Sequence, residues 1–215
     1  MMLNKKDILP IIIILIALVV GIQLYPSLPD KVPSHWNSQG EVDAQSSKGF
    51  VIFFMPFLAL AIYLLMTFIP RIDPLRKNYE KFAKVYFLFK VLLSLFFVAL
   101  YLFMLAAASG FEMNITYFML PAFSILFILI GIMLPKLKRN WFIGIRTPWT
   151  IHSDEVWSDT HKFSGRAFIT AGIVSFLGAF LPSFAFVIFL TAVLTAAAIS
   201  VVYSYFSFKK QGGFK

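Results

Sequence analysis

The chain has 215 residues, of which 60% are hydrophobic and 13% are charged. An ordinary soluble domain is about 45–50% apolar and about 25% charged, so this chain has too few polar residues to cover a water-soluble fold. It contains no cysteine, which excludes disulfides, thiolate metal ligands and a cysteine nucleophile.

The apolar runs predict an all-α membrane protein with about six transmembrane helices. A spanning helix needs about 20 predominantly apolar residues, and six such runs fill the chain. The fifth run is the shortest and ends at Leu181-Pro182, directly before the sixth, so these two form either a helical hairpin or a re-entrant pair that does not fully cross. The predicted spans are residues 8–24, 50–69, 85–109, 114–134, 167–181 and 183–206.

The first run is predicted to be a retained span. Lys5 and Lys6 precede it, as in a secretory signal, but the run continues from Ile8 to Leu24 and no small-x-small cleavage site follows. A cleaved signal peptide is the less favoured alternative.

The basic residues predict the orientation. In a six-span arrangement, sixteen of the 19 lysines and arginines fall on one side, and only Lys31 and Lys48 fall on the other. Short basic loops stay in the cytoplasm, so both termini and the loops at 70–84 and 135–166 are predicted to be cytoplasmic. Because the basic residues lie beside apolar runs, their excess does not indicate nucleic-acid binding.

The first long loop, residues 25–49, is predicted to face outward. Pro26, Pro29 and Pro33 oppose a helix there. Residues 32–36 and 41–44 are short extended segments that can pair as a hairpin around a turn; a plain connector is the alternative. The candidate ligand contacts in this loop are His35, Trp36, Asn37 and Glu41.

The second long loop, residues 135–166, is basic and aromatic. Lys136, Lys138 and Arg139 are suited to anionic lipid headgroups, and its tryptophans are suited to the membrane interface. Ser153 is a candidate N-cap for a helix that lies in the interface before the fifth span. One broad face of this helix holds Val156, Trp157, Thr160, Phe163 and Ala167, and the other face holds Asp154, Ser158 and Lys162.

Arg146 stands in an apolar stretch between Gly144 and Pro148, so its guanidinium needs a partner. The candidates are Asp154 or Glu155, a helix C-terminal carbonyl, and a lipid phosphate. An ion pair that holds the loop and a binding role both remain open.

No enzymatic or metal-binding motif is present, and we expect neither a cofactor nor a catalytic site. The spacing of the candidate metal ligands fits no strong signature; these candidates are His152, Asp154, Glu155, Asp159 and His161. A transporter or channel is the alternative function, although ionisable residues inside the spans are few. Lys90, near a span end, is expected to extend toward the membrane surface.

The second long loop resembles the SdpI family of bacterial integral membrane immunity proteins. The matching segments are residues 140–150 (NWFIGIRTPWT), 154–157 (DEVW) and 161–163 (HKF). The first half resembles the module of unknown function that often precedes this region, through Leu28-Pro29, Val32-Pro33, His35-Trp36-Asn37, Gly40-Glu41 and Lys48.

The resemblance implies a two-span module at residues 1–75 and a four-span region at residues 76–215. It implies immunity to a secreted peptide toxin in the bacterial cytoplasmic membrane. It also implies a signalling role, in which the protein holds a cytoplasmic transcriptional repressor at the membrane. The expected partners are thus lipids, a toxin and a repressor, and the expected functional residues of the second loop are Trp141, Gly144, Arg146, Thr147, Pro148, Trp149, Glu155, Trp157 and His161.

Overall fold

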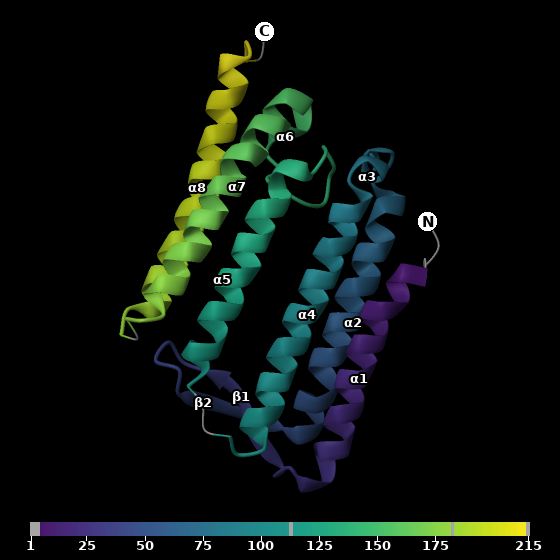
Figure 1. The fold of residues 1–215 in the computed structure, drawn as a ribbon, viewed down its shortest axis with the longest axis vertical. Helices are drawn as coiled ribbons and strands as arrows, with labels where there is room; N and C mark the ends of the chain where they lie inside the picture. Colours follow the sequence, from purple (N-terminus) through teal and green to yellow (C-terminus); the bar gives the residue numbers. More distant parts are fainter. Residues whose placement is uncertain (1–4, 112–113, 182, 214–215) are drawn as a thin grey trace. The chain divides into compact units, whose positions relative to one another are not determined.

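The computed structural model describes residues 5–111, 114–181 and 183–213 (Figure 1). Its long helices confirm the predicted class, a multi-pass α-helical membrane protein. Within the described residues, five helices are long and apolar enough to cross a membrane. They are α1 (Ile8–Leu24), α2 (Lys48–Ile72), α4 (Ala83–Ala108), α5 (Ile115–Met133) and α8 (Ala185–Lys210).

The helix α7 (Asp154–Gly178) corrects one prediction. The interfacial segment and the fifth span are not separate helices, because α7 runs through both without a break. Its first half carries several charged side chains, and α7 is not among the five apolar candidates. The count of six spans and the orientation of the termini stay predictions, and Pro182, expected at the following turn, lies outside the described residues.

The chain divides into two compact units that are not continuous in sequence. Unit 1 holds residues 1–68 and 90–119, and unit 2 holds residues 69–89 and 120–215. The predicted domain boundary between residues 75 and 76 stays a prediction.

Unit 1 joins α1, α2 and α4 to a β-hairpin. The hairpin pairs β1 (Lys31–Trp36) with β2 (Val42–Ser47) in antiparallel register, which confirms the predicted hairpin in the first long loop. A short 3-10 helix, η2 (Tyr25–Ser27), connects α1 to it. The hairpin adds Val32 to a core formed by the three helices, whose buried members are Ala17, Leu28, Val32, Val51, Ile52, Tyr101, Leu105 and Ala108.

Lys90 does not extend to the membrane surface as expected. Its side chain is 6% exposed and its Nζ lies 2.6 Å from Oδ1 of Asp7, at the end of the 3-10 helix η1 (Lys5–Asp7). Lys90 also donates to Oγ1 of Thr67, and the Tyr63 hydroxyl donates to the same Asp7 oxygen at 2.7 Å. A carboxylate and a hydroxyl thus compensate for burial of the ammonium. A lysine that extended to the membrane surface would not need these partners.

Unit 2 packs α7 between two partners by means of small residues. A Cβ on Gly165 would lie 2.7 Å from the carbonyl oxygen of Gly131 on α5, so the two backbones approach closely only because both residues are glycine. On its other side α7 runs beside α8 (Figure 1), where the rings of Phe163 and Tyr203 stack with centroids 4.2 Å apart. The segment between α5 and α7 contains η3 (Leu134–Lys136), an irregular stretch at 137–147 that we call the motif loop, and α6 (Pro148–His152).

Candidate functional site

His161 is the buried centre of the site in unit 2. Its side chain is fully buried on α7, and both ring nitrogens are bound. Nδ1 lies 2.8 Å from the carbonyl oxygen of Trp157, and Nε2 accepts a hydrogen bond from the backbone N–H of Ile145 at 3.0 Å. Because a carbonyl only accepts and a backbone N–H only donates, these contacts select the neutral tautomer with its proton on Nδ1.

The same environment holds His161 in its neutral form. Burial lowers the pKa of His161 to about 4, and the hydrogen bond to the Trp157 carbonyl offsets only part of that effect. The ring also stacks on the indole of Trp157, with centroids 4.0 Å apart. His161 therefore fixes the motif loop on α7 and is not available as a proton donor or a metal ligand.

Gly144 is required by the position of His161. Its φ of +103° lies in the left-handed region, which a side chain disfavours. A Cβ added there would also collide with Nε2 of His161. The motif residue thus has two independent reasons to be glycine.

Asn140 and Asp73 hold the beginning of the motif loop. The Asn140 side-chain oxygen accepts from the backbone N–H groups of Phe142 and Ile143, at 2.9 and 2.8 Å. Oδ2 of Asp73 accepts from the N–H of Trp141 at 2.9 Å and from the hydroxyl of Tyr79, in the short helix α3 (Asn78–Lys81), at 3.0 Å. Both acceptors are buried, so each compensates donors that the loop removes from water.

The sequence did not reveal these two roles. Asn140 is part of the matching segment, but only the folded loop shows that its side chain replaces backbone pairing. Asp73 is 68 residues from Trp141 in the chain, and its one local signal is the N–H of Leu75, which it accepts at 2.7 Å. Burial, with the hydrogen bond to Asp73, raises the pKa of Tyr79, so its hydroxyl remains a donor.

Thr147 and Thr150 end the motif loop and start α6. Each threonine side chain accepts from the backbone N–H of the other, which forms a reciprocal cap, and Pro148 occupies the first helical position. Oγ1 of Thr147 also lies 3.0 Å from Oγ of Ser204 on α8. The Trp149 ring contacts Tyr205 edge-on at 5.2 Å, so α6 is attached to the last turns of α8.

The start of α7 agrees with the sequence expectations. Ser153 caps it by accepting from the N–H of Val156, as predicted. Val156, Trp157 and Thr160 are buried, and Nε1 of Trp157 donates to the carbonyl of Leu137 at 3.0 Å. Glu155, also expected to be functional, is exposed on the opposite face.

Arg146 does not make the ion pair that was considered for it. Asp154 is paired with Arg139, whose Nε lies 2.8 Å from Oδ1 of the carboxylate. Arg146 is exposed, and one of its terminal nitrogens donates to the backbone carbonyl of Trp141 at 2.8 Å. This bond fixes the direction of the guanidinium without neutralising its charge.

Arg146 lies in an open surface groove of unit 2. The Trp141 side chain, 50% exposed, shares this groove, and none of the side chains that line it is acidic. Four of the expected functional residues are therefore together at one surface, whereas Gly144, Trp157 and His161 do not line it. The lining residues are Trp141, Arg146, Thr147, Pro148, Ile151 and His152.

The hairpin brings the four candidate contacts of unit 1 into one turn region. Asn37 organises it, because its side-chain oxygen accepts from the N–H groups of Gln39 and Glu41, both at 3.0 Å. Nδ1 of His35 lies 2.6 Å from Oδ1 of Asp43, and both side chains are largely exposed. Trp36 is half-buried against Phe103 on α4, with ring centroids 5.7 Å apart.

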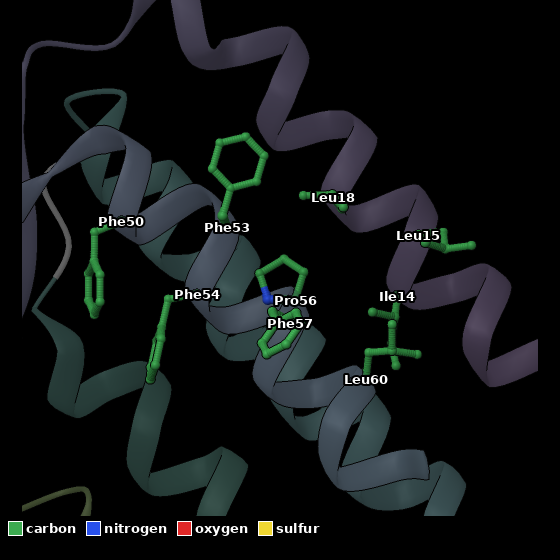
Figure 2. Close-up of a pocket in the computed structure, with 9 residues that line it drawn as sticks. All are labelled: Ile14, Leu15, Leu18, Phe50, Phe53, Phe54, Pro56, Phe57 and Leu60. Carbon is green, nitrogen blue, oxygen red and sulfur yellow. The ribbon is translucent and has the colours of Figure 1, made fainter.

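An apolar groove lies between α1 and α2 within unit 1 (Figure 2). Leu18 points from α1 toward Phe53 on α2, and the rings of Phe50 and Phe54 stack farther along α2 with centroids 4.8 Å apart. The groove has a volume of about 460 Å³ and no charged lining residue. Such a surface suits lipid chains or another apolar helix.

The candidate metal ligands are not assembled into a site. Among the residues that the structure describes, no group of three or more His, Asp or Glu side chains is placed to hold a metal ion. His161 uses both nitrogens within the fold, and Asp154 pairs with Arg139.

Two regions of the chain match known families of protein domains. Residues 136–204, which include the motif loop, match the SdpI/YfhL protein family, and residues 12–60 match a domain of unknown function (DUF1648). The chain is also 31% identical over 210 residues to "Immunity protein SdpI" of Bacillus subtilis (strain 168), covering 97% of this chain and 99% of that protein. The chain belongs to the SdpI/YfhL family. No solved structure matches it.

Family membership confirms the resemblance that was inferred from the motif loop. The match to the SdpI/YfhL family begins at Lys136 and includes His161 and Ser204, so these two contacts of the loop lie within it, whereas Asp73, which also holds the loop, lies outside it. The hairpin and the groove between α1 and α2 lie within or beside the region that matches the domain of unknown function. The relative supports a role as a membrane immunity protein.

Proposed function

We propose that this chain protects a bacterium from a secreted peptide toxin, as an immunity protein of the cytoplasmic membrane. The observation that carries this proposal is the similarity to Immunity protein SdpI, which extends over 97% of this chain rather than over one motif. The five apolar helices among its described residues support a location in the membrane, where a membrane-active toxin acts.

We further propose that the hairpin of unit 1 contacts the toxin. The support is that His35, Asp43 and Glu41 are exposed although Trp36 and Asn37 hold the strands and the turn in place. A rigid support with exposed polar groups loses little entropy on binding.

The surface of the motif loop is the proposed docking site for a cytoplasmic repressor. Its buried side chains account for the fold of the loop, but the exposure of Trp141 and the free charge of Arg146 do not contribute to that fold. Exposed Trp and Arg are the side chains most often enriched at protein interfaces.

The test of immunity is a protection assay. The gene is expressed in a sensitive strain that lacks its own copy, and cells are challenged with spent medium from a producing strain and with purified membrane-active peptides. We expect growth with the gene and killing without it. Equal killing with and without the gene, at confirmed protein levels in the membrane, would reject the immunity function.

Variants at each surface test the two proposed contacts independently. Arg146→Ala and Trp141→Ala test the motif loop, and His35→Ala with Glu41→Ala tests the hairpin. Lys138→Ala, on the motif loop but outside the groove, is the control for loss of a positive charge. We expect the hairpin variant to lose protection and the loop variants to lose repressor recruitment, measured by its localisation at the membrane.

One observation favours transport as a second candidate function. Asp7 and Lys90 form a buried ion pair beside Tyr63 and Thr67, and ionisable groups within membrane helices often mark an ion pathway. Proteoliposomes that contain a pH-sensitive dye test this directly. Proton flux that is abolished by Asp7→Asn would support transport, and flux equal to that of empty liposomes would exclude it for protons.

A further inference from the structure

The end of the motif loop and α6 contact the last two turns of α8. Thr147 contacts Ser204, Trp149 contacts Tyr205, and the ring of His152 meets Phe208 edge-on at 5.8 Å. These three residues of α8 lie in its last two turns. At a rise of about 1.5 Å per residue, Ser204 is about 9 Å from the end of α8 at Lys210.

α8 is one of the five candidate spans among the described residues, and its 26 residues exceed the length of about 20 that crosses the hydrocarbon core, so we take its end to extend into the headgroup region. Two basic residues, Lys209 and Lys210, occupy the last turn, where cations commonly meet lipid headgroups. The groove of the motif loop therefore lies at the depth of the headgroups and adjoining acyl chains, because it is attached to the two turns before that end.

The chemistry of the groove suits one kind of molecule at this depth. Arg146 supplies a full positive charge and several N–H donors, and a guanidinium matches the geometry of a phosphate. Its bond to the Trp141 carbonyl holds the charge in place, and Trp141, Pro148 and Ile151 supply apolar surface beside it. A neighbouring carboxylate would oppose an anion, but Asp154 is already neutralised by Arg139.

We infer that this groove binds the headgroup of an anionic phospholipid, with the phosphate at the Arg146 guanidinium and the upper acyl chain against Trp141 and Ile151. This site is separate from the toxin contact proposed at the hairpin and does not depend on the immunity function, but it uses the same Trp141 and Arg146 as the proposed repressor surface, so lipid and repressor compete there. A protein partner with an acidic segment has the same charge, but it lacks the apolar chain that the lining of the groove accommodates.

The experiment compares lipid binding by the full chain and by charge variants. Native mass spectrometry of the detergent-purified protein measures binding of phosphatidylglycerol and of phosphatidylcholine in titrations. We expect the wild type to prefer phosphatidylglycerol and Arg146→Gln to lose that preference by roughly fivefold, which corresponds to about 1 kcal/mol for one charge at a membrane surface. Arg146→Lys should retain part of the preference, because it keeps the charge but not the paired donors.

The control is Lys77→Gln, which removes an exposed charge of the same unit outside the groove. Its preference for phosphatidylglycerol should remain close to that of the wild type, and circular dichroism should show the same helix content in all variants. An equal loss in Lys77→Gln and Arg146→Gln would overturn the inference, because it would indicate general surface charge. No lipid preference in the wild type would also overturn it.

Two competition arms distinguish the source of the anion. Inorganic phosphate and a soluble poly-glutamate peptide are each added to the phosphatidylglycerol complex. We expect neither to displace the lipid, because neither supplies an acyl chain. Displacement by phosphate would show a simple anion site, and displacement by poly-glutamate would show a site for an acidic protein; either result would reject the lipid assignment.

Discussion

The imidazole of His161 fills the space beside Gly144, so residue 144 cannot carry a side chain. The imidazole Nε2 of His161 receives the N–H of Ile145, and the backbone of Gly144 passes directly beside that nitrogen. The positive φ of Gly144 turns the chain so that this N–H points at the ring. The exposed part of the motif loop thus depends on a contact between a glycine and a buried histidine.

Replacement of Gly144 by alanine should strongly destabilise unit 2. The new methyl group would collide with His161 and would also occupy a strained backbone conformation, so we expect a loss of about 3 kcal/mol or more in the free energy of unfolding. Gly212→Ala is a matched control, because its φ of +104° is similar but no atom lies within 4 Å of a Cβ there. Thermal unfolding in detergent measures both, and equal losses would show that the His161 contact contributes nothing.

Stability should depend on pH through His161. Its pKa in the folded protein, about 4, is below the ordinary value of about 6.5, so protonation favours the unfolded chain. Its stabilising contribution is complete above pH 6.5 and is lost as the pH falls from there toward 4, by on the order of 3 kcal/mol at most.

The pH effect is isolated by the difference between the wild type and His161→Gln, since carboxyl groups titrate in both. Unfolding followed by circular dichroism across this pH range should give a shallower slope for His161→Gln. His152→Gln, which alters an exposed histidine of the same unit, should retain the wild-type slope. A wild-type slope in His161→Gln would contradict the assignment.

The sequence predicted those features that depend on neighbouring residues. The apolar run at 8–24 has the same bounds as α1, and Ser153 caps α7 because a hydroxyl before a helix finds its partner three residues later. The extended segments on either side of Asn37 form a hairpin for a similarly local reason.

The features that the sequence did not predict depend on partners distant in the chain. Lys90 was expected at the membrane surface because its ion partner, Asp7, is 83 residues away. The carboxylate expected for Arg146 is taken by Arg139, and no local pattern distinguishes these two arginines. The continuous α7 was missed because its first half carries several charged side chains, which are typical of a surface helix, whereas the run that follows is apolar.

The buried pair of Asp7 and Lys90 should be strongly coupled. Asp7→Asn or Lys90→Met alone leaves an uncompensated buried charge, and we expect a loss of about 3–5 kcal/mol for each. The double replacement Asp7→Asn with Lys90→Met removes both charges and should cost clearly less than the sum of the single variants. A double-mutant cycle from unfolding in detergent measures this coupling.

The control for this cycle is the ion pair of Lys48 and Asp30, whose carboxylate side chain is 96% exposed. Asp30→Asn should leave the free energy of unfolding nearly unchanged, because water already solvates that charge. Additive effects of Asp7 and Lys90 would show that the pair does not stabilise the packing of α1 on α2 and α4.

Asp73 should control the mobility of the motif loop, although Asp73 is not itself one of the residues that line the groove. Asp73→Ala removes the acceptor of the Trp141 N–H and of the Tyr79 hydroxyl, and each buried donor left unpaired costs about 1–3 kcal/mol. We expect hydrogen exchange at residues 140–143 to accelerate about tenfold or more.

Tyr79→Phe removes only one donor and should have a smaller effect, whereas Glu80→Ala, an exposed carboxylate beside it, should leave exchange unchanged. Because Asp73 holds the N–H of the residue whose carbonyl directs Arg146, faster exchange should be accompanied by weaker binding at the groove; unchanged exchange in Asp73→Ala would mean that Asn140 alone holds the loop.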